Sequence, residues 1–327
     1  MTEADAASRP PPVKTWHKLL PWAITIACFA YLYTRISGAA AREEVSVVTY
    51  VSGVFGGVNW GEWLLLMIPY SLLFFLIDTA VVWSVVSWFN AKLRYLDILP
   101  IRGSSYILSI LNEQVGKGAM ALYLNRRYSV PGWEVGSSML FIMFCEFYYL
   151  LAWATIGYAM QADSLPEQFA LIPQVAVVAG LVLAGFLLFF SGRLSVGEGL
   201  RNRPILAAFR KAKPWHYLAV VVLRSPALLS AVVVYTLALR LFGVEVSFGA
   251  MLGYLPVIFF GAATPGPMRT VAITLWVALF PGREGQMAAF GFVQHNFFIF
   301  FNAAIGLIFL RRANRELFGS SEETVSG

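Results

Sequence analysis

The chain alternates long apolar runs with short polar segments. Two of the apolar segments, residues 98–124 and 249–280, are interrupted near their middles. Six others are uninterrupted and match the length of a spanning helix, which needs about 20 apolar residues; they cover 19–36, 62–88, 134–160, 168–191, 215–242 and 284–311. This pattern predicts an all-α polytopic membrane protein with about six transmembrane helices and two broken segments.

The two interruptions are the most informative positions in the chain. A bilayer tolerates broken backbone only where protein or an aqueous cavity covers it. Glycine permits turns that other residues resist, and proline cannot continue a helix. We therefore expect hinges at the glycines and prolines of the breaks, namely Gly116, Gly118, Pro265, Gly266 and Pro267. Paired broken segments in corresponding halves of a transporter indicate a substrate pathway.

Positive charges predict the topology, because basic residues favour the cytoplasmic side. The linker 161–167 and the turn 243–247 contain no base. The bases gather instead at Arg9/Lys14/Lys18, Lys92/Arg94, Arg126/Arg127, the run from Arg193 to Lys213, and Arg311/Arg312/Arg315. If these clusters share the cytoplasmic side, both termini are cytoplasmic and both broken segments are re-entrant, the first from the cytoplasm and the second from outside. If both segments are instead kinked spans, Lys92/Arg94 and Arg126/Arg127 fall on opposite faces, against the charge rule.

The re-entrant topology divides the chain into two repeats of opposite orientation. A cytoplasmic tail covers residues 1–18. The first membrane repeat is 19–165 with re-entrant segment 98–124, the second is 166–312 with re-entrant segment 249–280, and 313–327 is a second cytoplasmic tail. The inverted repeat follows from hydropathy and charge alone, since the two halves share no convincing residue-level identity.

Composition removes several classes of function. Of the 327 residues, 58% are hydrophobic and only 13% are charged, whereas soluble domains are about 45–50% apolar. The net charge of +6 comes from bases between apolar runs, which indicates contact with anionic headgroups and no nucleic-acid partner. Metalloprotease, paired-cysteine, nucleophile-elbow and Walker motifs do not occur, so we expect no enzyme, no cofactor and no metal site.

Four ionisable residues lie well inside apolar runs, where each is a functional candidate because a buried charge is costly. We expect Asp78, Glu146 and His295 to couple movement to protons or to gate the path, and Arg224 to contact substrate. Structural alternatives are open for each. Asp78 or Glu146 could pair with Arg224 or Lys117, Arg224 could snorkel to the cytoplasmic face, and His295 could simply hydrogen-bond across helices.

The breaks themselves predict an anion site. A half-helix that begins after each break presents unpaired N–H groups and a positive dipole end. Lys117 and Arg269 add full charges there, although Glu113 lies four residues before Lys117 and could neutralise it. We expect the following residues to bind a phosphate near the midplane: Asn112, Glu113, Lys117, Arg224 and Arg269.

At these segments the chain resembles the membrane flippase domain of lysylphosphatidylglycerol synthases and its stand-alone relatives. The first match is Leu111-Asn112, Gly116-Lys117 and Leu122 to Arg126; the second is Leu255-Pro256, Thr264-Pro265-Gly266 and the helix from Gly291 to Gly306. The resemblance covers roughly 60–311 and implies a lipid flippase. Two departures matter: the family places glutamate where this chain has Lys117, and its second motif continues to an Arg-Glu pair where this chain has Pro267-Met268-Arg269. Both departures remove acidic groups and the first adds a base, so a more anionic headgroup than a lysyl-lipid is expected. The aminoacyl-transferase domain that accompanies the synthases is also missing.

The expected function is a flippase or scramblase that moves an anionic phospholipid or polyprenyl-phosphate lipid between leaflets of the inner or plasma membrane. One alternative is an accessory membrane subunit that presents lipid to a glycosyltransferase or synthase, and another is an intramembrane lipid-modifying enzyme. The expected partners are a membrane lipid with an anionic headgroup and either a second copy of the chain or a lipid-modifying enzyme.

Overall fold

The computed structural model describes residues 15–109, 113–192, 197–263 and 269–318, and over these residues it is all-helical. Six of its helices contain segments long and apolar enough to cross a membrane. They are α1 (Thr15–Arg42), α3 (Trp60–Phe89), α6 (Gly132–Gln161), α7 (Ile172–Phe190), α10 (Pro214–Leu241) and α13 (Glu284–Phe318). The chain is therefore a multi-pass membrane protein, and the prediction of six spanning helices is confirmed.

Each broken segment forms two short helices. The first contains α4 (Tyr95–Ser109) and α5 (Glu113–Tyr128), and the second contains α11 (Phe248–Ala263) and α12 (Thr270–Leu279). The longest of the four have 16 residues and measure about 24 Å at 1.5 Å per residue, less than the roughly 30 Å hydrocarbon core. None of the four is long enough to cross the bilayer as an untilted helix.

The predicted hinges differ in their outcome. Gly116 and Gly118 were expected to form a turn, but both lie inside helix α5. A helix pairs its own N–H and C=O groups, whereas a turn in an apolar surrounding would leave some of these groups unpaired, and this outweighs the tendency of glycine to leave the helical conformation. Pro265, Gly266 and Pro267 lie outside the described residues, as does Asn112.

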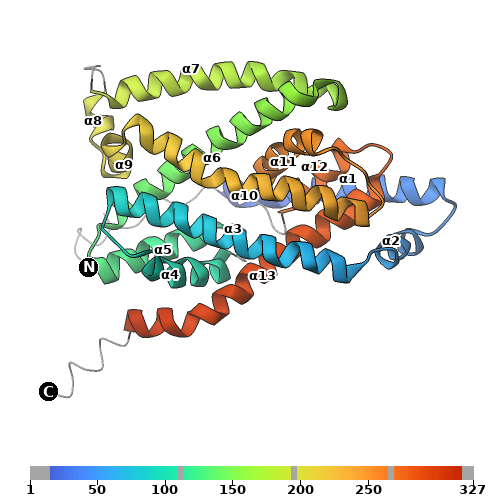
Figure 1. Ribbon diagram of the computed structural model, residues 1–327, viewed down its shortest axis with the longest axis horizontal. Helices are drawn as coiled ribbons and strands as arrows, with labels where there is room; N and C mark the ends of the chain where they lie inside the picture. The colour runs from blue at the N-terminus through green and yellow to red at the C-terminus, as the bar shows by residue number, and fades with distance from the viewer. Residues whose placement is uncertain (1–14, 110–112, 193–196, 264–268, 319–327) are drawn as a thin grey trace.

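The long helices lie side by side along the long axis of the molecule (Figure 1). The pair α4 and α5 follows the end of α3, precedes the start of α6 and occupies the left-hand half of Figure 1, where α8 (Glu198–Arg201) and α9 (Ala207–Lys211) also lie. The pair α11 and α12 occupies the right-hand half, towards the end that holds α2 (Val47–Gly56). Short 3-10 helices at Ala162–Ser164, Glu167–Leu171 and Pro204–Leu206 complete the connections.

Close crossings between glycines join the two halves of the chain. Helix α6 packs along α11, α13 packs along α4, and α3 packs along α10. A Cβ atom on Gly157 of α6 would lie 2.6 Å from the Cα of Gly253 in α11. A Cβ atom on Gly306 of α13 would lie 2.6 Å from the carbonyl oxygen of Gly103 in α4. Both crossings therefore need small residues, as is typical of helix contacts in membranes.

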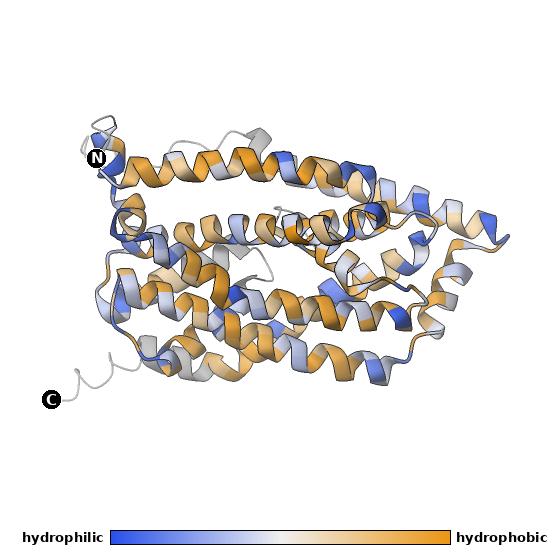
Figure 2. Ribbon diagram, turned by 45° about the horizontal axis from the view of Figure 1, so that its top comes forward, coloured by the Kyte–Doolittle hydropathy of each residue, from blue (hydrophilic) through white to orange (hydrophobic). Residues whose placement is uncertain are grey.

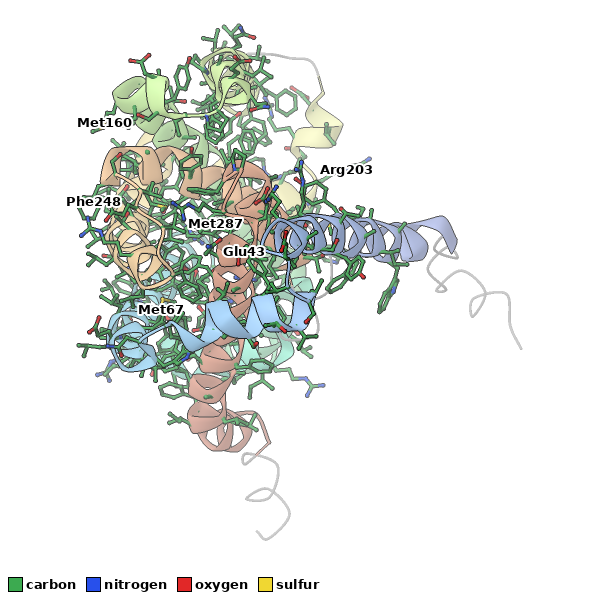
Figure 3. The ribbon with its side chains drawn as sticks, turned by 90° about the vertical axis from the view of Figure 1, so that its right-hand side faces the viewer. Glu43, Met67, Met160, Arg203, Phe248 and Met287 are labelled. Atoms are coloured by element: carbon green, nitrogen blue, oxygen red, sulfur yellow. The ribbon has the colours of Figure 1, made fainter. Side chains whose placement is uncertain are left out.

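The helices are apolar along most of their length and hydrophilic mainly near their ends and connections (Figure 2). Helix α7 exposes a row of large side chains that includes Val177, Leu181 and Leu188, a surface that suits lipid contact and would be costly in water. The end-on view of Figure 3 shows Met287 towards the middle of the bundle, Met160 and Phe248 at its margin, and α1 leaning away from the other helices.

Candidate functional site

A network of ion pairs joins four helices inside the bundle. Asp78 of α3 accepts a hydrogen bond from Nε of Arg102 in α4 at 2.5 Å and from a terminal nitrogen of Arg224 in α10 at 3.4 Å. Arg224 also donates to Glu146 of α6 at 3.2 Å. The hydroxyl of Tyr106 donates to Asp78 at 2.7 Å. Two carboxylates thus balance two guanidinium groups, and we call Asp78, Arg102, Glu146 and Arg224 the ion network.

Three members of the ion network are buried and one lies at its rim. Asp78, Arg102 and Arg224 are 4%, 7% and 9% exposed, whereas the side chain of Glu146 is 33% exposed. The Nε–H of Arg224 is buried and has no acceptor within the part of the chain that the structure describes. A ligand could therefore approach the ion network from the side of Glu146. There the Nε–H of Arg224 is available as a further hydrogen-bond donor.

The turn of α10 that carries Arg224 is held by polar neighbours. Pro226 follows Arg224 inside a continuous helix and has no N–H to donate to the preceding turn. Tyr149 of α6 donates to the carbonyl oxygen of Arg224 at 3.3 Å, and Trp153 donates to the hydroxyl of Ser225 at 3.0 Å. These contacts attach the turn to α6 and set the position of the guanidinium.

A second polar cluster lies between α3, α10, α12 and α13. Arg269 precedes the first residue of α12 with a left-handed backbone (φ 51°), and its guanidinium carbon lies 5.7 Å from the ring centroid of Phe298. The amide nitrogen of Gln294 donates to the hydroxyl of Tyr235. The rings of Tyr235 and Tyr70 are 5.4 Å apart.

His295 is buried in the same region and has no hydrogen-bond partner among the described residues. It is 1% exposed, and neither ring nitrogen makes a hydrogen bond in the described structure. Arg269 lies within electrostatic reach of His295, Tyr235 and Tyr70. The expected hydrogen bond from His295 to another helix is absent among the described residues, which leaves its two nitrogens for a ligand, water or proton.

The structure separates residues that the sequence placed in one site. Asp78 and Glu146 both pair with Arg224, as the structural alternative for them required, and Arg224 is buried in these pairs and does not snorkel. No described hydrogen bond or ion pair joins Arg269 or His295 to the ion network. The side chains of Glu113 and Lys117 lie outside the described part of the structure, so their expected roles stay predictions.

Sequence reasoning missed Arg102, which makes the shortest contact of the ion network. Its signal was present, because an arginine lies eight residues after Arg94 inside the apolar segment 98–124 and an ionisable residue at such depth is a functional candidate.

No family model, curated protein or solved structure matches this chain. The resemblance to flippase domains therefore stays an expectation from the quoted motifs. Among the described residues, no group of three or more histidine, cysteine, aspartate or glutamate side chains could hold a metal ion.

Proposed function

We propose that this protein is a lipid flippase or scramblase that moves a lipid with an anionic headgroup between membrane leaflets. The observation that carries the proposal is the ion network of Asp78, Arg102, Glu146 and Arg224 inside a membrane bundle. Replacing a buried ion pair by packed apolar residues is often neutral or stabilising. A helix bundle does not need such a network to fold, and ionisable groups at membrane depth commonly serve a substrate path.

The arrangement of the helices supports an inverted repeat of residues 19–165 and 166–312. In that repeat α4 corresponds to α11, and α6 corresponds to α13. The two Gly–Gly crossings, α6 with α11 and α13 with α4, are then equivalent contacts across a pseudo-two-fold axis between the paired helices α3 and α10. The short-helix pairs occupy opposite halves of the bundle (Figure 1), as re-entrant segments from opposite faces do in transporters.

Charge at the two ends supports an orientation with both termini in the cytoplasm of a plasma membrane. The loop with Lys92 and Arg94 follows α3 at the end of the bundle that also holds α8 and α9 with Arg201, Arg210 and Lys211 (Figure 1). The opposite end carries bases together with acids, and the acids include Glu43, Glu44 and Glu284. By the positive-inside rule the first end is cytoplasmic.

In this proposal the Glu146 carboxylate accepts the hydrogen bond from Arg224 that the substrate phosphate accepts once it has bound. A phosphate that reaches the rim replaces the Glu146 carboxylate and adds the free Nε–H of Arg224 to its contacts. Asp78 and Arg102 keep the guanidinium in position during the exchange. If Glu146 takes up a proton as it leaves Arg224, the bound phosphate monoanion replaces its negative charge. The net charge of the site is then the same with and without substrate.

Reconstitution of the purified chain in liposomes tests the function. We expect movement of labelled phosphatidylglycerol but much slower movement of phosphatidylcholine. Arg224→Lys keeps the charge and loses the forked donor geometry, so a loss of about 1.5–3 kcal/mol of charge-assisted contact slows movement roughly 10- to 100-fold. Arg240→Gln is the matched control, because Arg240 is exposed at the end of the same helix.

Other outcomes assign the protein to another class. A well-folded protein that retains lipid but moves none is an accessory subunit, and one that changes the mass of the lipid is an enzyme. Either result ends the flippase proposal.

A further inference from the structure

The second polar cluster combines a positive charge with polar atoms that have no partner. Among the described residues, no carboxylate lies within ion-pair distance of Arg269 and its guanidinium makes no hydrogen bond; it lies over the ring of Phe298. This contrasts with Arg224, which has two carboxylates. A half-buried guanidinium in an aromatic surrounding is costly without a counter-ion, so the cluster has an excess of positive charge.

Two buried side chains near Arg269 have no hydrogen-bond partner among the described residues: Thr270 follows it in the chain, and His295 lies three residues before Phe298, whose ring Arg269 contacts. The hydroxyl of Thr270, at the first residue of α12, is buried and has no partner in the described structure. Both nitrogens of His295 are likewise buried and unpartnered. Helix α12 has ten residues and begins immediately after Arg269, so its first N–H groups and its positive dipole end add to the excess.

We propose that Arg269, Thr270 and His295 form a second anion site, which binds a phosphate group and is distinct from the Arg224 site. A phosphate oxygen accepts from the guanidinium, from the Thr270 hydroxyl and from one N–H of His295. Among the described residues, each of these groups is a buried or half-buried donor without an acceptor, and the phosphate gives each an acceptor.

The two sites lie at different levels along the bundle. On α10, Tyr235 follows Arg224 by eleven residues, or about 17 Å along the helix; on α3, Tyr70 precedes Asp78 by eight residues, or about 12 Å. The second site is therefore nearer the end of the bundle that holds α2 (Figure 1). Tyr149 lies between them, since its hydroxyl contacts the carbonyl of Arg224 and is within electrostatic reach of Tyr70.

For transport, this inference rests on the proposed function: a headgroup passes from Arg224 to Arg269 on its way between leaflets. Two binding positions in series let each hold the phosphate weakly enough for release. Binding itself is independent of transport and is tested separately.

Native mass spectrometry of the full chain from phosphatidylglycerol nanodiscs measures the binding. We expect Arg269→Gln to retain one phosphatidylglycerol fewer than the unmodified chain, and His295→Phe, which keeps an aromatic ring without nitrogens, to weaken retention roughly tenfold. Arg240→Gln should retain the same number as the unmodified chain. Thermal melting in phosphatidylcholine nanodiscs, with and without inorganic phosphate, identifies the source: stabilisation of the unmodified chain but not of Arg269→Gln assigns the site to free phosphate.

Unchanged retention and unchanged phosphate response in Arg269→Gln would overturn the second site. If the unmodified chain also moves lipid in liposomes, that result leaves the flippase function standing. Conversely, loss of retention in Arg269→Gln, in a chain that moves no lipid, supports the anion site and rejects the flippase. His295→Gln, which restores a polar side chain, should recover part of the binding lost in His295→Phe, and a failure of both variants to differ from the unmodified chain removes His295 from the site.

Discussion

Neutralising Asp78 should destabilise the protein far more than neutralising Glu146. One carboxylate oxygen of Asp78 accepts from Arg102 at 2.5 Å and from Tyr106 at 2.7 Å, and the other contacts Arg224 at 3.4 Å. Asp78→Asn removes the only negative charge of the ion network that is fully buried. Removing one partner of a buried pair typically costs about 3–5 kcal/mol, a large part of the roughly 5–15 kcal/mol by which proteins are stable.

Glu146→Gln removes a single 3.2 Å contact from a side chain that is 33% exposed. Arg224 keeps its ion pair with Asp78 in this variant, so no buried charge loses its last partner, and we expect a cost of about 1 kcal/mol, the net value of an ordinary hydrogen bond. Both substitutions replace a carboxylate by its amide of equal size, which makes cavity formation negligible in each. We therefore expect the loss of unfolding free energy to be at least threefold larger for Asp78→Asn.

Unfolding in mixed micelles of increasing sodium dodecyl sulfate, followed by circular dichroism, measures the difference. Asp163→Asn is the matched control, because Asp163 is an exposed acid in the linker between α6 and α7. The double variant Asp78→Asn/Arg102→Gln removes one charge of each sign, so it should lose less stability than the sum of the two single variants. Equal losses for Asp78→Asn and Glu146→Gln, or a double variant that is fully additive, would refute the assignment of the pair as a buried structural contact.

Three further predictions follow from packing, topology and charge. Gly157→Val should destabilise the protein by about 1–3 kcal/mol, because the added atoms meet the backbone of α11. Gly180→Val on α7 should have no such effect, because no atom lies within 4 Å of its Cβ position. The same unfolding assay compares the two variants. Cysteines at Lys92 and Arg126 should label from one side of the membrane and a cysteine at Ser164 from the other, and labelling of positions 92 and 126 from opposite faces contradicts the re-entrant arrangement. Glu146→Gln should fold and move lipid with reduced pH dependence; an unchanged pH profile in a well-folded variant excludes Glu146 as the coupling group.

The number and extent of the spanning helices were predictable from the sequence, and so was the division of 98–124 and 249–280 into shorter pieces. The physical reason is that a bilayer requires about 20 apolar residues per helix and satisfied backbone groups throughout, and both requirements act locally along the chain. The placement of Asp78, Glu146, Arg224 and His295 within long apolar helices was predictable for the same reason.

Only the tertiary structure decided which of these residues meet. Membrane helices are apolar on all sides, so the sequence of α10 does not show which neighbour Arg224 faces, and its partners Asp78 and Glu146 lie 146 and 78 residues away along the chain. Arg102 belongs to the ion network because α4 packs against α3, which carries Asp78, whereas Arg269 and His295 belong to a separate cluster where α12 packs against α13. The position of a charged residue along its helix can be read from that helix alone. Which partner it meets depends on how several helices are rotated and packed against one another.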